Sequence, residues 1–428
     1  MVHCGGQLLS SSSTSRRVSH VTFSTLGGAG SVAKQLQEGQ LSAGITSRLL
    51  TMTDSNIQSL LTKNPLLVGE ALFDFFGVRK SVESQLFTLY RNSENRRVAK
   101  AVQHSDDLIH LHWTPGVLSL ETIGSLARSG RGCVWTLHDM WPFTGGCHHA
   151  GDCRGFLSGC RDCPQIRNVF SSKTERNYGK KLEILHREPS VRVVSPSKWL
   201  ADLAQQSEIF SHLKVDVIPN PVNCEVFSPG DRKSAREVFG ISSEAFVVGC
   251  SAANLSDPMK NMKTIVDGVV ELKRQFPNNE IQILAVGEGE LKSENIKVQT
   301  TGLIDTPSRM VSAYRAMNVF VSMSFAENFP MTLVEAASVG VPIVCSANGG
   351  MPEIVVNGVT GTVLNSPIQL TEAIAQLLLD CDVEMSMSSE ARSMALRRFE
   401  LSKIVKEYSV VYGEQIDKNV DYQSRNDI

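Results

Sequence analysis

The stretch Glu327-Asn-Phe-Pro-Met-Thr-Leu-Val-Glu335 decides the fold, because it joins a strand to a helix and carries a carboxylate at each end. Shortly before it, Met317 to Ser324 is a mostly apolar segment of strand length. After it, Gly340 ends the helical pattern, and Val341 to Ser346 reads as another strand. A strand, a loop, a helix and a second strand in this order are typical of a parallel α/β sheet.

The beginning of this helix is suited to binding an anion. Pro330 fits the first helical position, where its missing N–H costs nothing, and the free amides of Met331 and Thr332 then face outward. Glu327 lies at the carboxyl end of the preceding strand, the edge at which open α/β sheets bind ligands. A structural alternative stays open, because a carboxylate near a helix start stabilises the helix dipole and Glu335 could be the solvated face of an apolar helix.

Length and composition describe an ordinary globular protein with room for two domains. The 428 residues are 42% hydrophobic and carry a net charge of -2, which argues against a general nucleic-acid binder. Residues 1–16 are expected to be a disordered leader, since they contain a serine run and no apolar core of signal-peptide length. No apolar run is long enough to span a bilayer. We therefore expect a cytoplasmic protein, with peripheral contact at the inner face of a membrane left open.

The alternation of strands and helices predicts two doubly wound, Rossmann-like domains that face each other across a cleft. The N-terminal domain is expected over residues 17–222 and the C-terminal domain over 223–398, with a closing helix and a loose tail over 399–428. A proline-containing linker without helical periodicity runs from Val215 to Asp231. The predicted strands are Arg17–Thr25, Asp107–Leu111, Cys133–Leu137, Val191–Ser195, Phe246–Ser251, Ile281–Val286, Val298–Thr300, Val319–Ser322 and Val341–Cys345. Helices are predicted over Ser31–Glu38, Leu118–Arg128, Met262–Gln275, Met310–Ala316, Met331–Val339, Leu370–Leu379 and Val383–Arg398.

Candidate polar and glycine residues follow strands of the N-terminal domain. Gly28 lies in the glycine turn Gly27 to Gly30, directly after the first strand. Of the two histidines in Ile109-His-Leu-His-Trp113, only one is expected to face the cleft, and His112 is nearer to the loop. His138 ends another strand, where it could orient a sugar hydroxyl or move a proton, or could be a satisfied polar group at the sheet rim.

Candidates in the C-terminal domain follow two further strands. Lys260 precedes a helix, where a cation is unfavourable to the helix dipole, and this favours a bound anion such as a diphosphate. Asn254 lies in the same loop. Gly287, in Val286-Gly-Glu-Gly289, would keep another strand end open.

Four cysteines lie within a segment predicted as an insert over residues 147–163. Cys147, Cys153, Cys160 and Cys163 offer four soft ligands, and the Cys-x-x-Cys pair is common in structural zinc sites. An iron–sulfur cluster, disulfides and free thiols are the alternatives.

Taken together, these motifs resemble those of the retaining glycosyltransferases of family 4, which have the two-domain GT-B fold. The first stretch quoted above resembles the Glu-x₇-Glu motif of that family. The remaining segments that carry the resemblance are Val286-Gly-Glu-Gly289, Gly349-Gly-Met-Pro-Glu353, Ser195-Pro-Ser-Lys-Trp199 and Pro219-Asn-Pro-Val222. The segment Trp135-Thr-Leu-His-Asp-Met-Trp141 and the cysteines after it resemble a subset of mostly bacterial enzymes that make cell-surface polysaccharides.

The resemblance implies a role for each candidate residue. Glu335 would hold the nucleotide ribose, Lys260 the diphosphate and Glu327 the transferred sugar. His112 would sit beside the anomeric centre, and Gly28 would make room for the diphosphate or the acceptor. Backbone contacts to phosphate or sugar would come from Asn328, Phe329, Pro330 and Met331.

The implied reaction is transfer of a sugar from a nucleotide-diphosphate sugar to a hydroxyl of a saccharide or lipid-linked saccharide, with retention of configuration. The chemistry would require no cofactor, and the expected use is synthesis of cell-surface polysaccharides or glycoconjugates. Many family members carry an arginine at the position of Asn254, so Lys260 would act alone or with Lys263 or Arg309. The alternatives are a sugar-nucleotide epimerase or phosphorylase of the same fold, and a sugar-nucleotide-binding protein with reduced catalysis.

Overall fold

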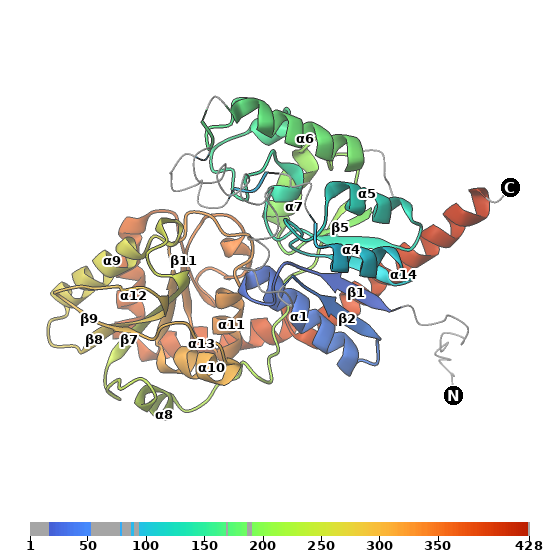
Figure 1. The fold of residues 1–428 in the computed structure, drawn as a ribbon. Helices are drawn as coiled ribbons and strands as arrows, with labels where there is room; N and C mark the ends of the chain where they lie inside the picture. The colour runs from blue at the N-terminus through green and yellow to red at the C-terminus, as the bar shows by residue number, and fades with distance from the viewer. Residues whose placement is uncertain are drawn as a thin grey trace, which may run out of the picture.

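The computed structural model describes residues 17–52, 78, 87–89, 94–167, 170–185 and 191–426. Two domains follow one another along the chain, each built on a six-stranded sheet with helices against it (Figure 1). All strand pairs within the two sheets are parallel. The predicted GT-B architecture is therefore confirmed. The predicted leader, residues 1–16, lies outside the described residues.

The first sheet has the strand order β2-β1-β3-β4-β5-β6. Its strands are β1 (Val18–Val21), β2 (Ser47–Leu50), β3 (Leu108–Leu111), β4 (Cys133–Thr136), β5 (Val191–Ser195) and β6 (Val215–Val217). The helices that accompany it are α1 (Gly27–Ser42), α4 (Arg96–Gln103), α5 (Leu120–Arg128), α6 (Ser171–Leu185) and α7 (Lys198–Gln206).

The second sheet has the strand order β12-β11-β10-β7-β8-β9. Its strands are β7 (Phe246–Asn254), β8 (Ile281–Glu288), β9 (Lys297–Thr300), β10 (Val319–Ser322), β11 (Ile343–Ser346) and β12 (Gly361–Leu364). Its helices are α8 (Arg232–Glu237), α9 (Met262–Gln275), α10 (Pro307–Ala316), α11 (Met331–Val339), α12 (Leu370–Leu379) and α13 (Cys381–Arg398). The bounds of α9 and α11 equal the predicted ones, and Gly340 ends α11 in the left-handed conformation with a φ of 82°.

The last helix, α14 (Leu401–Asn426), returns to the first domain (Figure 1). Ile404, Tyr408 and Tyr412 are four residues apart, and they form a buried stripe that packs with Val32 and Leu36 of α1 against the first sheet. The sequence predicted a closing helix and a loose tail over residues 399–428. The helix is present, and it continues to Asn426 where the tail was expected. No proline after Pro367 interrupts it.

The chain crosses between the domains twice, and the two crossing segments lie side by side. The backbone amide of Val222 donates a hydrogen bond to the carbonyl of Phe399 (2.8 Å), and the amide of Leu401 donates one to the carbonyl of Val222 (3.0 Å). Val222 belongs to the predicted linker after β6, and Phe399 follows α13. The pairing fixes the two crossings to each other.

Candidate active site

A cleft of about 390 Å³ lies between the carboxyl ends of strands from both domains. From the first domain come the residues after β1, the first turn of α1 and the ends of β3 and β4. From the second domain comes the loop between β10 and α11. The lining residues are Thr22, Phe23, Ser24, Leu26, Gly27, Gly28, Ala29, Gly30, Trp113, His138, Asp139, His149, Asn220, Glu327, Asn328, Phe329, Pro330 and Met331.

The glycine segment forms one wall of this cleft. The sequence predicted a turn before the helix, whereas Gly27 already begins α1, so the glycines make its first turn. A Cβ atom at Gly30 would lie 2.1 Å from the carbonyl oxygen of Ser24, which excludes any larger residue there. A Cβ atom at Gly28 would have no further heavy atom within 4 Å, so this position is open.

The Glu327 to Met331 loop forms the facing wall. Pro330 is the N-cap of α11 rather than its first helical residue, because its ψ of 123° is extended. The carbonyl of Pro330 accepts from Leu333 (3.2 Å), so the amides of Met331 and Thr332 precede the first hydrogen bond of the helix. This is the arrangement that binds anions.

Lys260 reaches this wall from the loop after β7, the strand that pairs with β10 in the sheet. Its Nζ donates to a carboxylate oxygen of Glu327, and the two side chains are 29% and 17% exposed. Asn261, which follows Lys260, has a left-handed φ of 52°, and this conformation separates Lys260 from helix α9. The ion pair brings together two of the three residues predicted to be catalytic.

Glu335 lies further along α11 and is not among the residues that line the cleft. The hydroxyl of Tyr314 donates to its carboxylate (2.9 Å). Burial raises the pKa of Glu335 to about 7, although the hydrogen bond from Tyr314 lowers it. In the absence of a ligand this carboxyl group is thus partly protonated at neutral pH.

Asn254 and Gly287 lie at the ends of β7 and β8. Asn254 is exposed, and its side-chain oxygen accepts from the amide of Ser256 (2.9 Å). Gly287 has a φ of 144°, and a Cβ atom there would lie 1.7 Å from the carbonyl oxygen of Ala252. Neither residue lines the cleft.

The two other cations considered at this site point elsewhere. Lys263 is 84% exposed and pairs with Asp267, and the guanidinium of Arg309 lies 5.9 Å from the ring centre of Phe239. Among the described residues that line the cleft there is no lysine or arginine. Lys260 does not line the cleft itself, but it pairs with Glu327, which does.

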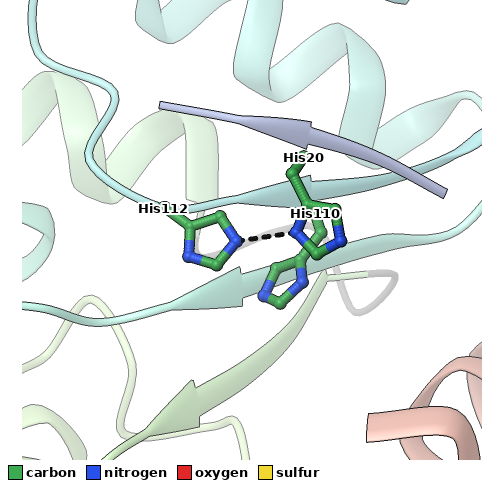
Figure 2. A group of neighbouring side chains, drawn as sticks. All are labelled: His20, His110 and His112. Carbon is green, nitrogen blue, oxygen red and sulfur yellow. Dashed lines mark hydrogen bonds between the residues drawn. The ribbon is translucent and has the colours of Figure 1, made fainter. Parts of the chain in front are cut away.

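Three histidines, His138, His112 and His110, extend from the N-terminal domain's wall of the cleft into that domain. His138 lines the cleft, and its Nε2 lies 3.0 Å from Nδ1 of His112, which is only 2% exposed. His110 and His112 are two residues apart, so both lie on the same face of β3, with ring centres 4.1 Å apart (Figure 2). The expectation that one of these two histidines, His112, faces the cleft is wrong. Neither of them lines the cleft, whereas His138 does.

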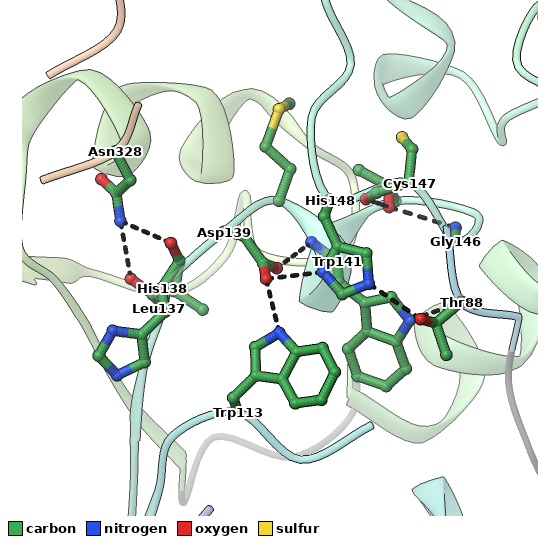
Figure 3. Close-up of polar contacts among 12 residues, drawn as sticks. Thr88, Trp113, Leu137, His138, Asp139, Trp141, Gly146, Cys147, His148 and Asn328 are labelled. Atoms are coloured by element: carbon green, nitrogen blue, oxygen red, sulfur yellow. Dashed lines mark hydrogen bonds and ion pairs between the residues drawn. The ribbon is translucent and has the colours of Figure 1, made fainter. Parts of the chain in front are cut away.

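Asn328 closes the seam between the domains (Figure 3). Its side-chain oxygen accepts from the hydroxyl of Ser197 (2.6 Å), and its amide nitrogen donates to the carbonyls of Leu137 (3.2 Å) and His138 (3.1 Å). The predicted binding residue therefore uses its side chain to hold the two domains together. Phe329 is buried, and its ring packs edge-on against Phe399.

Glu353 makes a second contact across the seam. Its carboxylate accepts from the backbone amides of Lys198 and Trp199, both at 2.7 Å, and so caps the beginning of α7 in the other domain. Two segments noted in the sequence, Ser195 to Trp199 and Gly349 to Glu353, thus meet at one place.

Asp139 is a functional candidate that the sequence reasoning missed. Its carboxylate accepts from Nε1 of Trp113 (2.8 Å), Nδ1 of His148 (2.7 Å) and the amide of Trp141 (2.8 Å) (Figure 3). Burial alone would raise the pKa of Asp139, but the charge and hydrogen bond of His148 and the hydrogen bond from the Trp141 amide lower it to about 2. Its position in the sequence could have indicated this role, because Asp139 directly follows His138 after the end of β4.

The four predicted metal-ligating cysteines, Cys147, Cys153, Cys160 and Cys163, line one small cavity, and no disulfide joins them. Cys160 and Asp162 both have left-handed φ angles, 56° and 50°, and the amide of Gly145 donates to Sγ of Cys160 (3.0 Å). Among the residues that the structure describes, one group of at least three ligand atoms lies within 4.8 Å, and it consists of His20, His110 and His112.

The architecture and the cleft define the class of protein. Residues 26–226 match the model of glycosyltransferase family 4, and residues 245–380 match that of glycosyl transferases group 1. Domains of the family 4 and group 1 glycosyltransferase types are thus both present in the chain.

Individual proteins are similar to this chain over most of its length. WcaC of Escherichia coli (strain K12), a glycosyl transferase assigned to colanic acid biosynthesis, is 24% identical over 352 residues, which are 77% of this chain and 82% of that protein. D-inositol 3-phosphate glycosyltransferase of Corynebacterium efficiens is 23% identical, with 74% and 73% covered.

Solved structures share the fold. Anabaena Alr3699/HepE in complex with UDP-glucose has a TM-score of 0.61 and 17% identity, over 93% of this chain and 100% of that one. A glycosyltransferase from Rickettsia africae has a TM-score of 0.64 and 16% identity, over 94% and 99%. In the part of the chain that the structure describes, no helix combines the length and hydropathy needed to span a membrane.

The raised pKa of Glu335 predicts a pH-dependent stability. The folded protein keeps this proton up to about pH 7, whereas the unfolded chain loses it near 4.5, so the free energy of unfolding falls as the pH rises through this interval. The stability of Glu335→Gln relative to wild type should therefore increase between pH 5 and pH 8, by on the order of 2 kcal/mol.

Urea unfolding at the two pH values measures this difference. Glu372→Gln, an exposed position on α12, is the matched control and should show no such change. An equal stability difference at both pH values for Glu335→Gln would contradict the assignment.

Proposed function

We propose that this glycosyltransferase moves a sugar from a nucleotide-diphosphate sugar to the hydroxyl of a saccharide or lipid-linked saccharide, with retention of configuration. The observation that carries the proposal is the pairing of Lys260 with Glu327 beside the open start of α11. A cation and unbonded helix amides on one wall suit a diphosphate, and a carboxylate beside them suits sugar hydroxyls.

Binding of the donor would change the partner of Lys260. In the structure without ligand Lys260 and Glu327 neutralise each other, and a diphosphate would compete for the ammonium group. Glu327 would then be released to accept hydrogen bonds from the transferred sugar. Because Asn254 brings no charge, Lys260 would supply the side-chain cation of the phosphate site.

The remaining roles follow from position. Glu335 would accept hydrogen bonds from the ribose hydroxyls, displacing Tyr314. His138, rather than His112, would lie beside the reacting centre, since His138 lines the cleft. Gly28, on the opposite wall, would leave space for the acceptor.

In the proposed reaction the bond from the anomeric carbon to the diphosphate oxygen breaks, a bond to the acceptor oxygen forms, and the proton of the acceptor hydroxyl leaves with the diphosphate. Negative charge develops on the leaving diphosphate, where Lys260 and the amides of Met331 and Thr332 would stabilise it. The sequence contains one Asp-x-Asp triplet, Asp380-Cys-Asp382. Asp380 accepts from the amides of Asp382 and Val383, both at 3.1 Å, so it caps α13 and lies outside the cleft. This supports chemistry that does not use such a metal site.

Synthesis of a cell-surface polysaccharide or glycoconjugate is the proposed setting. Similarity to WcaC supports it, as does the fold shared with WaaG, a glycosyltransferase involved in lipopolysaccharide biosynthesis (TM-score 0.61). HepE bound to UDP and to UDP-glucose supports a nucleotide-sugar donor. We place the enzyme in the cytoplasm, with peripheral contact at the inner face of the membrane where a lipid-linked acceptor would lie.

The cysteine cavity is proposed to hold a structural zinc ion. Four thiols around one cavity, with left-handed residues at Cys160 and Asp162, resemble the tight turn of a Cys-x-x-Cys zinc site. Binding would draw the four sulfur atoms together. The ion would stabilise the loop that follows His138 and take no part in the transfer.

Removal of the cation tests the function. Lys260→Ala should lower kcat by about a hundredfold or more, because the leaving diphosphate loses its side-chain cation. Lys263→Ala is the matched control, since this nearby lysine is 84% exposed and paired with Asp267, and it should keep wild-type turnover.

Release of nucleotide diphosphate is measured with and without candidate saccharide acceptors. Wild-type turnover in Lys260→Ala would contradict the site assignment. Breakdown of the donor at the same rate without any acceptor would contradict transfer and favour a phosphorylase or hydrolase.

Elemental analysis of the purified protein tests the zinc proposal. About one zinc ion per chain is expected, and it should be lost in Cys160→Ser but kept in Cys381→Ser, whose cysteine is exposed and outside the cavity. Absence of zinc and iron, together with four titratable thiols in this segment, would end the metal proposal.

A further inference from the structure

A line of buried polar side chains runs from the wall of the cleft into the first domain. It begins at His138, whose Nε2 lies 3.0 Å from Nδ1 of His112. Nε2 of His112 lies 2.9 Å from Nδ1 of His20 (Figure 2). Nε2 of His20 lies 2.9 Å from the side-chain oxygen of Gln40, whose amide nitrogen donates to the hydroxyl of Tyr412 on α14 (3.1 Å).

The Gln40 amide determines which nitrogen of each ring carries the proton. Its oxygen can only accept, so His20 donates from Nε2 and accepts at Nδ1. His112 must then donate from Nε2 to His20 and accept at Nδ1. His138 must in turn donate from Nε2, which leaves its Nδ1 as a hydrogen-bond acceptor.

The rings of this line are neutral at neutral pH. Burial lowers the pKa of His20 and of His138 to about 4, and burial together with the neighbouring histidines holds the pKa of His112 well below its ordinary value. A neutral imidazole has one donor and one acceptor, as the line requires.

A metal ion is the other use that this cluster suggests, since nitrogen atoms of His20, His110 and His112 lie within 4.8 Å. Both nitrogens of His110 already have partners, however, at 2.8 Å from the hydroxyls of Tyr412 and Thr136. His20 and His112 use their facing nitrogens on each other. A cation would have to break these bonds, so the geometry favours a hydrogen-bonded line.

We propose that Gln40, His20 and His112 are positioning residues, which fix the tautomer of His138 so that Nδ1 presents its lone pair to a sugar hydroxyl in the cleft. The inference rests on the proposed glycosyl transfer for the identity of that hydroxyl. The tautomer itself does not depend on it.

The same line connects the last helix of the chain to the cleft. Tyr412 accepts from the Gln40 amide nitrogen and so helps to orient the amide whose oxygen faces His20. Its hydroxyl also lies 2.8 Å from Nδ1 of His110. Helix α14 follows the C-terminal domain in sequence, yet it completes the orientation of a histidine on the N-terminal domain.

The tautomers can be read directly from the wild-type protein. Long-range ¹H–¹⁵N spectra of histidine-labelled protein at neutral pH should show His20, His112 and His138 all protonated on Nε2, with His138 identified by its loss in His138→Gln. A proton on Nδ1 of His138, an imidazolium there, or metal-shifted signals from His20 and His112 would overturn the inference. This measurement uses no substrate, so its failure and the failure of the proposed function are distinguishable.

Substitution of Gln40 tests the consequence for turnover. Gln40→Leu removes the acceptor and should lower kcat by roughly tenfold or more, with the donor KM within about twofold, because His138 then populates both tautomers. Gln40→Glu keeps an acceptor facing His20 and should restore the Nε2 tautomer and most of kcat.

Ser207→Ala is the matched control. Ser207 is equally buried in the same domain, and its hydroxyl donates to the carbonyl of Phe143 (3.2 Å), away from the histidine line. This variant should keep wild-type kcat. Equal loss of kcat in Gln40→Leu and Ser207→Ala, or a folded Gln40→Glu as inactive as Gln40→Leu, would overturn the positioning role. If Gln40→Leu does not fold, the wild-type spectrum decides alone.

Discussion

The site depends on one buried side-chain amide at the seam between the domains. Asn328 lies between Glu327 and Phe329 in the C-terminal domain, and its amide binds three groups of the N-terminal domain, the Ser197 hydroxyl and the carbonyls of Leu137 and His138. Leaving a buried polar group without its partner costs about 1 to 3 kcal/mol. The bonds therefore hold the loop that carries Glu327 against the strand end that carries His138, and both walls of the cleft are fixed by the same residue.

The contacts across this seam fix the positions of the charged and polar groups of the cleft before a ligand binds. The fold determines the positions of three groups at the cleft: the Lys260 and Glu327 pair, the first amides of α11 and the neutral His138. In the proposed transfer, little reorganisation of these groups would therefore be needed when charge develops on the leaving diphosphate. Because the ion pair is partly buried, solvent screens the Lys260 ammonium group less, and its attraction for a competing anion is stronger. Asp139 adds to this order by binding Trp113, His148 and Trp141 beside the cleft.

Sequence reasoning predicted every central strand but only one of the four edge strands, β9, for a physical reason. Strands β2, β6 and β12 were not predicted, and all three are edge strands with one neighbour and partly exposed residues, so their apolar pattern is weak. In the site, residues at strand ends were found because their position follows from the order of elements. The depth of His112 behind His138 could not be predicted, because it depends on partners such as Gln40 and Tyr412 that are far away in the sequence.

A crystal structure with a bound nucleoside diphosphate tests the central claim most directly. The nucleotide is chosen as the UDP, GDP or ADP form that most raises the melting temperature. We expect the terminal phosphate within hydrogen-bond distance of Nζ of Lys260 and of the amides at the start of α11, with the ribose on Glu335 and Glu327 released from its ion pair. A nucleotide bound elsewhere, with Lys260 still paired to Glu327, would contradict the account.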